Sequence, residues 1–388
     1  MSGDKVPAKS ICFVGIENLL VLAPEYQTHG IGGAQLQQTL LARALVRNGF
    51  SVSMVVANYG QADGASWDGI TTYRAYRIDA GIRGLRLIHP RATSIWSAMK
   101  RAKADIYYSS CADYLPGVLA LFAQIHDRKT VFRVAHDTDC QPDKLLIPNW
   151  RGKALYKYGI ARTDLILAQS ATQRGDMLKN FKRDSIVIPS LVDPGSAERS
   201  FAERDIEVQW VGNIRAFKRP NLALDLAQMT PELHVHLIGG VDERSPDDYE
   251  TTRARAATIP NVVFHGPKPY DEVEERLTRT RVFINTSDSE GFPNTYMQAW
   301  ARGTPVVAFF DPDGVIARDG LGRAVTSLEE MRAAVRDYVQ NPDSWAAASA
   351  RCRRYVTQRH GTSAIASYVE ALSSLLQPPA GATVTGSH

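Results

Sequence analysis

The chain has 388 residues, of which 44% are hydrophobic and 22% charged, a composition typical of a globular protein long enough for two domains. The 45 Lys and Arg against 41 Asp and Glu leave a net charge of +4, which is too small to indicate a protein that binds nucleic acid. No apolar run reaches the ~18 residues of a membrane span, and the first residues lack a signal-peptide core. Cys12, Cys111, Cys140 and Cys352 lie far apart, so we expect a cytoplasmic protein without a disulfide framework or a zinc site.

The first half of the chain alternates short apolar segments with segments of helical periodicity, which predicts an α/β domain. Strands are expected at 11–14, 52–57, 106–109, 129–135, 164–168 and 186–188, and helices at 34–48, at 115–125 and after Ser170. Residues 58–103 contain many Gly and Arg and are expected to form a solvated basic loop. Contact with an anionic acceptor or a membrane surface is the alternative. Pro189, Pro194 and Gly195 then interrupt the pattern, so a domain boundary is expected near residue 195.

A glycine-rich turn separates the first strand from the first helix. It contains Gly30, Gly32 and Gly33, and glycines let backbone amides approach a phosphate without side chains in the way. The loop is long and its spacing differs from the GxGxxG dinucleotide fingerprint. The turn is therefore either a phosphate site or an ordinary structural turn.

His136 follows an apolar segment, at the end of a strand where a parallel sheet presents its chemistry. Polar neighbours weaken the alternative of a buried core histidine. Asp137 with Asp139, and Asp311 with Asp313, have the spacing of carboxylates that hold a divalent cation. Such spacings are common in loops and neither pair has further ligands nearby in the sequence, so we predict no metal site.

A stretch of aromatic and basic residues follows. It consists of Arg151, Lys153, Tyr156, Lys157 and Tyr158. A solvated helix face is the expected structure, and contact with anionic lipid is the alternative.

The second half of the chain repeats the alternation of strands and helices. After a predicted strand at 208–211, the loop before the next helix carries Arg215, Lys218 and Arg219. Three cations within five residues at the carboxyl end of a strand suit a diphosphate. The two domains are expected to span 1–195 and 196–377.

The end of the chain is expected to be helical from Leu328 on, with Tyr368, Leu372 and Leu375 on one face. Residues 378–388 are small and polar, and are expected to form a disordered tail.

The stretch 282–309 has the pattern of strand, loop, helix and strand. We expect the helix to be capped at Asn294 and to end at Gly303. Glu290 precedes this helix and Gln298 lies about one turn into it, so both side chains are expected to face one small site near a helix N-terminus. A phosphorylated, hydroxylated ligand fits such a place, and a plain surface loop is the alternative.

Several segments carry a family resemblance. They are the helix QLQQTLLARALVRNGF after the glycine turn, FRVAHDTDC, DLILAQSATQ, SIVIPSLVD, VGNIRAFKRPNLAL, NVVFHGPKP and SEGFPNTYMQAWARGTPVV. Together they resemble the GT-B glycosyltransferases of family 4, over most of the chain. The resemblance implies an α/β GT-B fold, in which the parallel sheets of two Rossmann-like domains face a central cleft and a C-terminal helix crosses back to the N-terminal domain.

The resemblance also implies a function. Such enzymes move a sugar, with retention, from a nucleoside diphosphate sugar to an acceptor hydroxyl in polysaccharide or glycoconjugate biosynthesis. The donor is expected to be of UDP or GDP type, with no metal or other cofactor. The acceptor is expected to be a carbohydrate or a lipid-linked saccharide, with peripheral contact on the inner face of a membrane as an accompanying hypothesis.

The implied site residues fall into two groups. His136, which would contact the transferred sugar, and Glu290, which would bind its hydroxyls, are the catalytic candidates. The donor-binding candidates are Gly32, Gly33, Asn213, Arg215, Lys218, Gly291, Phe292, Pro293, Asn294 and Gln298.

Two positions depart from the family pattern. Asn213 stands where the family has Arg, and Arg215 is our hypothesis for the missing cation. Gln298 stands where the family has an acid that binds the ribose. Since an amide both donates and accepts, we expect Gln298→Ala to weaken nucleotide binding and Gln298→Glu to be mild. A sugar-nucleotide epimerase and a non-catalytic nucleotide-sugar binding protein are the rival functions.

Overall fold

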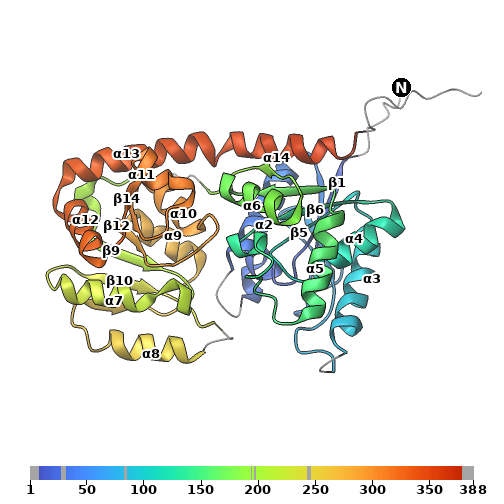
Figure 1. The fold of residues 1–388 in the computed structure, drawn as a ribbon, viewed down its shortest axis with the longest axis horizontal. Coiled ribbons are helices and arrows are strands. Elements are labelled where there is room, and N and C mark those ends of the chain that lie inside the picture. The colour runs from blue at the N-terminus through green and yellow to red at the C-terminus, as the bar shows by residue number, and fades with distance from the viewer. Residues whose placement is uncertain are drawn as a thin grey trace, which may run out of the picture.

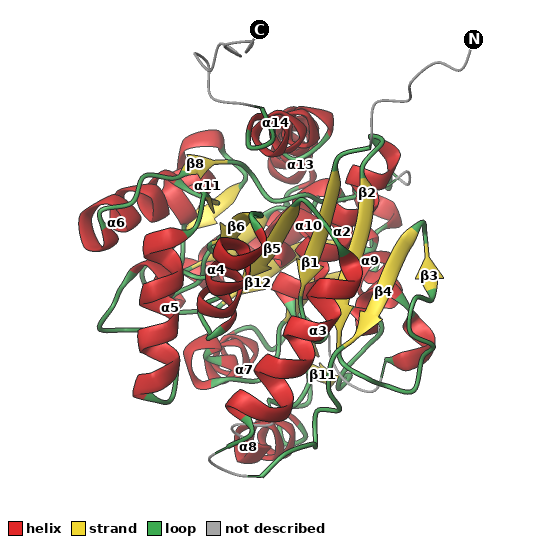
Figure 2. Ribbon diagram, turned by 90° about the vertical axis from the view of Figure 1, so that its right-hand side faces the viewer, coloured by secondary structure: helices red, strands yellow, loops and turns green. Residues whose placement is uncertain are grey.

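The computed structural model describes residues 8–27, 32–82, 85–193, 195, 198–242 and 246–377, which form two α/β domains side by side (Figure 1). Gly30, Pro194 and the expected tail at 378–388 lie outside the described residues. The view turned by 90° shows the strands of the first domain with helices on both sides of them (Figure 2). A three-layer arrangement of this kind buries parallel strands on both faces.

The first sheet has eight strands in the order β3-β4-β2-β1-β5-β6-β7-β8, and all neighbouring strands are parallel except β3 and β4. The strands are Ser10–Val14 (β1), Ser51–Val56 (β2), Ser66–Trp67 (β3), Ile70–Arg74 (β4), Ile106–Ser110 (β5), Lys129–Arg133 (β6), Leu165–Ala168 (β7) and Ile186–Val187 (β8). The helices are Leu19–Leu22 (α1), Gly33–Arg47 (α2), Thr93–Ala102 (α3), Leu115–His126 (α4), Trp150–Arg162 (α5) and Ala171–Phe181 (α6), with shorter turns at Pro24–Tyr26, Leu87–Ala92 and Asp137–Cys140.

The second sheet has six parallel strands in the order β11-β10-β9-β12-β13-β14. The strands are Ile206–Val211 (β9), Val235–Ile238 (β10), Val262–Phe264 (β11), Thr280–Asn285 (β12), Val306–Ala308 (β13) and Gly322–Ala324 (β14). The helices are Pro220–Met229 (α7), Pro246–Ala256 (α8), Tyr270–Thr278 (α9), Asn294–Ala301 (α10), Val315–Asp319 (α11), Leu328–Gln340 (α12), Pro342–Arg359 (α13) and Thr362–Ser374 (α14), with shorter turns at Phe201–Glu203, Ala216–Lys218 and Pro312–Gly314.

Local sequence signals account for several helix starts. The Asn149 side chain accepts a hydrogen bond from the Gly152 amide at 2.8 Å at the start of α5, and Ser170 caps α6 in the same way. Ser327 caps α12 and Asn341 caps α13. Each cap satisfies a backbone amide that the first turn of a helix leaves without a partner.

The stretch 58–103 is only in part the solvated loop that its Gly and Arg content predicts, with many exposed residues in the segment between β4 and α3. It contains β3, β4 and α3, and Ile70 and Thr72 of β4 are fully buried beside β2. The short β4 has two Thr in place of a continuous apolar run, which is why periodicity did not reveal it. The prediction of a solvated face at 151–158 is wrong for Tyr156, which is fully buried and donates to the Asp139 carbonyl at 2.8 Å.

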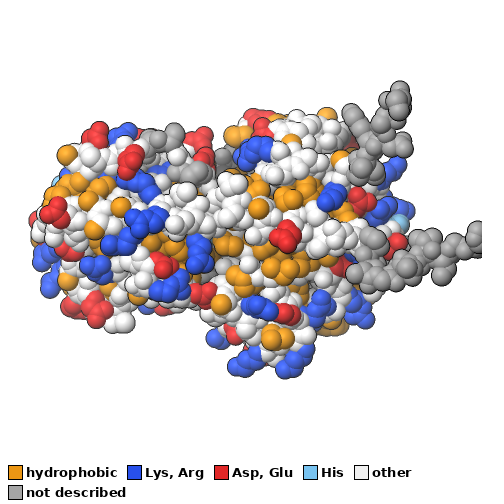
Figure 3. Space-filling model, turned by 90° about the horizontal axis from the view of Figure 1, so that it is seen from above, with side chains coloured by type: hydrophobic (Ala, Val, Ile, Leu, Met, Phe, Trp, Pro, Cys, Tyr) orange, Lys and Arg blue, Asp and Glu red, His pale blue; other side chains and the backbone are white. Residues whose placement is uncertain are grey.

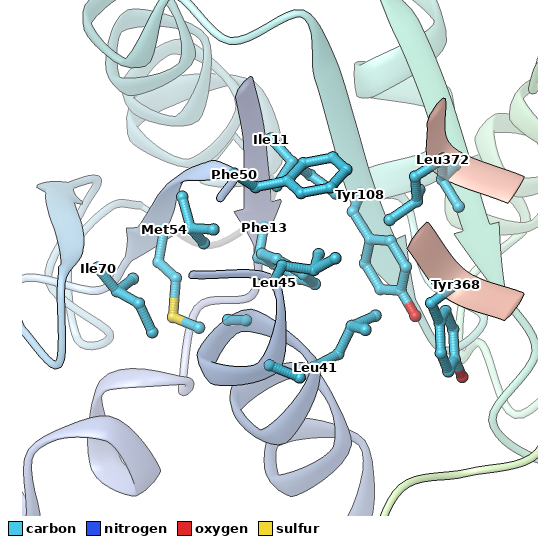
Figure 4. Packing of buried hydrophobic residues seen from close by; sticks show 14 of the residues in the cluster. Ile11, Phe13, Leu41, Leu45, Phe50, Met54, Ile70, Tyr108, Tyr368 and Leu372 are labelled. Atoms are coloured by element: carbon cyan, nitrogen blue, oxygen red, sulfur yellow. The ribbon is translucent and has the colours of Figure 1, made fainter. Parts of the chain in front are cut away.

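The last helix, α14, returns from the second domain to the first (Figure 1). Its residues Ala364, Tyr368, Ala371 and Leu372 belong to the same core cluster as Leu41, Tyr108 and other residues of the first domain. The close-up shows Tyr368 and Leu372 beside Tyr108 (Figure 4). The first core is therefore completed by the C-terminal end of the described chain.

The surface seen from above carries many Lys and Arg side chains over the second domain (Figure 3). The helix α13, which runs along this side in Figure 1, contributes the exposed residues Arg351, Arg354 and Arg359. For the described residues, no helix is both long and apolar enough to cross a membrane.

Candidate functional site

A cavity of about 750 Å³ lies between the two domains, where carboxyl ends of strands from both sheets meet. Its volume is in the range of small-molecule sites. All the site residues predicted from the sequence line it: Gly32, Gly33, His136, Asn213, Arg215, Lys218, Glu290, Gly291, Phe292, Pro293, Asn294 and Gln298. The fold therefore brings the predicted residues of both halves together.

The first wall of the cavity is the N-terminus of α2. Gly32 precedes the helix in an extended conformation, and residues 32–37 line the cavity. The amides of a first helical turn have no intrahelical partners and carry the positive end of the helix dipole. This wall is suited to an anion.

Asn294 joins this wall to the second domain. It does not cap α10 as the sequence predicts, because Pro293 is the N-cap residue and Asn294 is already helical. Its side-chain amide instead donates to the Gly33 carbonyl at 2.8 Å and accepts from Gln37 Nε2 at 3.0 Å. Asn294 thus holds the N-termini of α2 and α10 next to each other.

The His136 ring presents a hydrogen-bond donor to the cavity. Its Nδ1 accepts from the Thr138 amide at 3.1 Å, which places the proton of the neutral ring on Nε2. Nε2 is buried and has no hydrogen-bond partner among the described residues. A ligand in the cavity that offers a hydroxyl or carboxylate oxygen would satisfy this N–H group.

The two Asp-x-Asp pairs have structural partners. Asp139 accepts from the amides of Ala135 and His136, and Asp137 accepts from Gln173 Nε2 at 2.9 Å. Asp311 accepts from two amides at the start of α11, and Asp313 accepts from the first amides of α6 in the other domain. Within the described ranges no group of three His, Cys, Asp or Glu could hold a metal ion.

Lys218 and Glu290 form an ion pair at the cavity wall. The Lys218 ammonium contacts Glu290 Oε1, and Ser287 Oγ donates to the same oxygen at 2.7 Å. Glu290 is buried, so its charge is held by these two neighbours. The pair places a cation and a carboxylate on the same wall.

The remaining cations of the 212–220 loop have distinct roles. Arg215 lines the cavity and pairs with Asp242 at 2.7 Å, so a carboxylate offsets part of its charge. Arg219 does not line the cavity but donates to the Thr286 carbonyl at 2.7 Å and pairs with Asp288. Arg219 therefore fixes the loop that carries Glu290, and the prediction of three cations at one diphosphate is wrong for this residue.

Gln298 has a neighbour that the sequence does not reveal. Its Nε2 donates to Glu274 Oε1 on α9 at 2.6 Å, and Glu274 also pairs with Arg302. The expectation that Gln298→Glu is mild assumed an isolated amide. Because Glu274 is in contact with it, this substitution would place two carboxylates against each other.

The domains touch directly around the cavity. A Cβ atom added to Gly291 would lie 2.4 Å from the Ala135 carbonyl oxygen, so only a glycine allows this approach. On another side, Asp313 binds the Ala171 amide at 2.7 Å and Thr172 Oγ1 at 2.7 Å. Loops of the two domains are therefore in direct contact beside the cavity and at a second place.

Sequence reasoning missed several lining residues. They are Glu17, Gln37, Arg133, Lys268 and Tyr270. Arg133 lies inside a strand and Gln37 inside a helix, where no turn or glycine signal marks them. Glu17 follows β1, and its position after a strand was the one available clue.

A smaller cavity of about 450 Å³ lies within the first domain, between β4 and α3. Arg101 pairs there with Asp63 at 3.0 Å and donates to the Arg74 carbonyl at 2.7 Å. Since these charges already have partners, the interdomain cavity is the better site for an anionic ligand.

Two known families match consecutive parts of the chain. The family described as Glycosyltransferase Family 4 matches residues 31–196, and the family described as Glycosyl transferases group 1 matches residues 196–347. Together the two matches extend over most of the chain.

Individual relatives are more distant. A D-inositol 3-phosphate glycosyltransferase from Mycolicibacterium gilvum is 28% identical over 143 residues, which cover 36% of this chain and 30% of that protein. A second one, from Corynebacterium aurimucosum, is 28% identical over 38% of this chain and 41% of its own length. The matched part of the chain thus spans less than half of these curated relatives.

Solved structures share the whole fold. Sucrose-phosphate synthase from Thermosynechococcus elongatus has a TM-score of 0.72 at 15% identity, covering 95% of this chain and 99% of that structure. The Anabaena protein HepE, in complex with UDP and glucose, has a TM-score of 0.70 at 14% identity, covering 94% and 100%. Two matching family domains in sequence order and one shared architecture show that this chain belongs to the GT-B glycosyltransferases of family 4.

Proposed function

We propose that the protein is a retaining glycosyltransferase that moves a sugar from a nucleoside diphosphate sugar to an acceptor hydroxyl in polysaccharide or glycoconjugate biosynthesis. The observation that carries the proposal is the interdomain cavity, in which two helix N-termini and the side chains of Lys218, His136 and Glu290 face one space. The arrangement provides donors for an anion next to acceptors for sugar hydroxyls.

The diphosphate would lie against the positive groups. Negative charge grows on the leaving diphosphate as the glycosidic bond breaks, so groups that stabilise this charge lower the barrier. Lys218 and the amides at the starts of α2 and α10 supply such groups, with Arg215 beside them. We propose that these groups allow transfer without a metal.

The transferred sugar would lie between His136 and Glu290. Lys218 pairs with Glu290 in the structure. When Lys218 binds a diphosphate instead, the Glu290 carboxylate becomes available to accept hydrogen bonds from sugar hydroxyls. The Nε2–H group of His136 would donate to the sugar from the other domain. In transfer with retention, the acceptor hydroxyl attacks from the face that the diphosphate leaves, and these two residues hold the sugar that develops positive charge.

The nucleoside would extend along the second domain. Gln298 would bind the ribose, and a UDP or GDP donor is the proposed class. The fold of HepE, which was determined with UDP and glucose, supports a donor of this kind. Closure of the two domains around the donor would exclude water and limit hydrolysis.

The acceptor would enter on the side of the first domain. We propose a carbohydrate or lipid-linked saccharide, with peripheral contact between the protein and a membrane. The segment after β4 supports this contact, because Ile78, Ile82, Leu85 and Ile88 are exposed there and Arg86 is among them.

A thermal-shift screen with UDP, GDP, ADP and their sugars tests the donor site, since a ligand that binds the folded state raises the unfolding temperature. Transfer of radiolabelled sugar to a lipid or saccharide extract tests the reaction. We expect Glu290→Ala to lower transfer by at least about a hundredfold and to leave nucleotide affinity within about threefold. Glu290 contacts Lys218, and its removal frees that cation for the diphosphate.

Glu329→Ala removes an exposed acid of α12 and serves as the control, with activity unchanged. Full turnover by Glu290→Ala would remove this residue from the mechanism. A wild-type protein stabilised by no nucleotide would refute the proposed function. An epimer formed from the donor without acceptor would identify an epimerase, and donor binding without transfer would identify a binding protein.

A further inference from the structure

Gln298 and Glu274 form a buried pair at the wall of the interdomain cavity. Gln298 is 5% exposed and lines the cavity, whereas Glu274 is 8% exposed and lies behind it on α9. Gln298 Nε2 donates to Glu274 Oε1 at 2.6 Å. Tyr270, which also lines the cavity, interacts through its hydroxyl with both Glu274 and Gln298.

The carboxylate determines which way the amide points. An ionised carboxylate only accepts hydrogen bonds, and the NH₂ group of Gln298 is the only end of the amide that donates. The contact with Glu274 therefore directs the NH₂ group toward α9 and leaves the carbonyl oxygen as the acceptor on the side of the cavity. A carbonyl oxygen at the wall of a cavity is a group to which a ligand hydroxyl can donate.

Arg302 is the counter-ion of Glu274 and favours its charged form. It pairs with Glu274 Oε2 and also donates to the Asp193 carbonyl in the connection between the domains. Burial raises the pKa of Glu274 above its usual value, and Arg302, Gln298 and the Tyr270 hydroxyl offset part of this rise. Arg302, Tyr270 and Asp193 are the charged or titratable groups that act on this carboxyl.

We propose that Glu274 is a positioning residue, which orients Gln298 so that its carbonyl oxygen accepts a hydrogen bond from a ribose hydroxyl of the donor. The inference rests on the proposed function, because it requires a nucleotide in the cavity. Gln298 would contact the ribose, and Glu274 would hold Gln298 in the required orientation. The negative charge of Glu274 would not itself contact the ligand.

A purely structural ion pair between Glu274 and Arg302 makes a different prediction. In that case Glu274 would have no effect on the amide of Gln298. The exchanged double variant would then bind nucleotide no better than either single variant. If the carboxylate orients the amide, the exchanged pair again has one donor group facing one acceptor, and an acceptor oxygen still faces the cavity.

The test is calorimetric titration of UDP and of GDP into wild-type protein, Glu274→Gln, Gln298→Glu and the exchanged double variant Gln298→Glu with Glu274→Gln. For Glu274→Gln we expect affinity to fall about fivefold to tenfold, since the amide introduced at position 274 can donate as well as accept and no longer fixes the orientation of Gln298. For Gln298→Glu we expect a loss of more than about tenfold at about pH 8, because two carboxylates are in contact. This loss should shrink at about pH 6, where the pair shares a proton.

The exchanged double variant should recover most of the affinity at about pH 8, to within about threefold of wild type. Glu275→Gln removes an acid from the exposed side of the same helix, where it pairs with Arg199 and Arg279, and should leave affinity unchanged. Thermal unfolding of each variant shows whether it folds.

The outcomes separate the two hypotheses. A wild-type protein that binds neither UDP nor GDP refutes the proposed function. If wild type binds and Glu274→Gln binds equally well, Glu274 has no positioning role. A double variant that binds no better than Gln298→Glu, or that does not fold, also overturns the inference, because the two groups are then not interchangeable.

Discussion

Gly291 determines how closely the two domains approach each other. Its Cα faces the Ala135 carbonyl, and any side chain would meet that oxygen at 2.4 Å. The obstacle is backbone, which cannot move aside as a flexible side chain can. A single hydrogen atom in place of a methyl group therefore permits the close approach of the two domains beside the cavity.

We expect Gly291→Ala to separate the loops around the cavity, and to lower transfer by at least about tenfold through misplacement of Glu290 and His136. Folding of the separate domains should persist, because the clash lies between them. Transfer assays, circular dichroism and small-angle scattering, which reports separation of the domains, measure these effects.

Gly175→Ala is the matched control. Gly175 lies on the exposed face of α6, and an added Cβ would meet nothing within 4 Å. This substitution should leave transfer unchanged and stabilise the protein by about 0.5–1 kcal/mol, since Ala loses less backbone entropy in a helix. Unaltered transfer by Gly291→Ala would show that closure does not depend on this contact.

At the residue scale, the sequence reveals the site residues that follow strands. His136, Lys218 and Glu290 each lie in a loop beyond a carboxyl end, which is where a parallel sheet collects its ligands. Glu274 could not be found in this way, since α9 has no motif and the contact with Gln298 joins two helices that only the tertiary fold brings together. The sequence therefore does not show that Glu274 contacts Gln298, and it does not show that Gln298→Glu would bring two carboxylates together.

At the scale of elements, the connection between the domains is held from several sides. The Leu191 backbone exchanges two hydrogen bonds with the Gln37 side chain, at 2.7 and 2.8 Å. Ser190 Oγ accepts from Arg133 at 2.7 Å, and its carbonyl accepts from His360 Nδ1 at 2.8 Å. Side chains from several elements therefore hold residues 190 and 191 in place, where the chain passes from the first domain to the second.

His360, at the junction of α13 and α14, makes this connection sensitive to acid. Burial lowers its pKa to about 4, and the nearby Arg359 and Arg133 charges act in the same direction. An unfolded histidine has a pKa of about 6.5, so the unfolded state binds the proton first as the pH falls. The contribution of neutral His360 is thus intact above about pH 6.5 and decreases between about pH 6.5 and 4, by about 3 kcal/mol in total.

We expect urea unfolding of the wild type to lose more stability between about pH 7 and 5 than unfolding of His360→Gln, which has no group that titrates there. Both proteins have the same carboxylates, so the effect of their titration cancels when the two unfolding free energies are subtracted. His234→Gln alters an exposed histidine and should follow the wild type. Parallel pH profiles of wild type and His360→Gln would contradict the assignment.

At the scale of the whole molecule, one edge of the first domain is suited to a membrane surface. Ile82 is 73% exposed and Ile88 is 65% exposed in the segment that follows β4, and Trp150 is exposed where α5 begins. Both places follow the carboxyl ends of strands, on the side of the sheet that faces the cavity. A membrane docked there would lie near the entrance for an acceptor.

We expect the protein to sediment with vesicles that contain anionic lipid, and the double variant Ile82→Ser with Ile88→Ser to bind at least about tenfold more weakly, because each apolar side chain contributes about 1.5–3 kcal/mol when buried. Ile125→Ser is the control, since Ile125 is 67% exposed at the far end of α4, near the beginnings of the strands. Equal effects of the two substitutions, or no binding of wild type at low salt, would refute the membrane contact.

Most of the architecture could be predicted from the sequence. The alternation of apolar and helical segments indicated two α/β domains, and the family motifs indicated how they face each other. The polar strand β4 was not predicted because it lacks a continuous apolar run, and α8 was not predicted because it lacks an apolar stripe. The contacts between the domains join residues far apart in the chain, which periodicity cannot reveal.

The return of α14 to the first domain has a consequence for biosynthesis. A ribosome makes residues 10–187 early, yet Tyr368 and Leu372, which cover Leu41 and Tyr108, are among the last described residues to emerge. Arg133, buried in the first domain, donates to the Tyr368 hydroxyl and gains this partner only then. The part of the chain that is made first therefore stays unfinished, with an apolar groove exposed to chaperones, until translation of the second domain is complete.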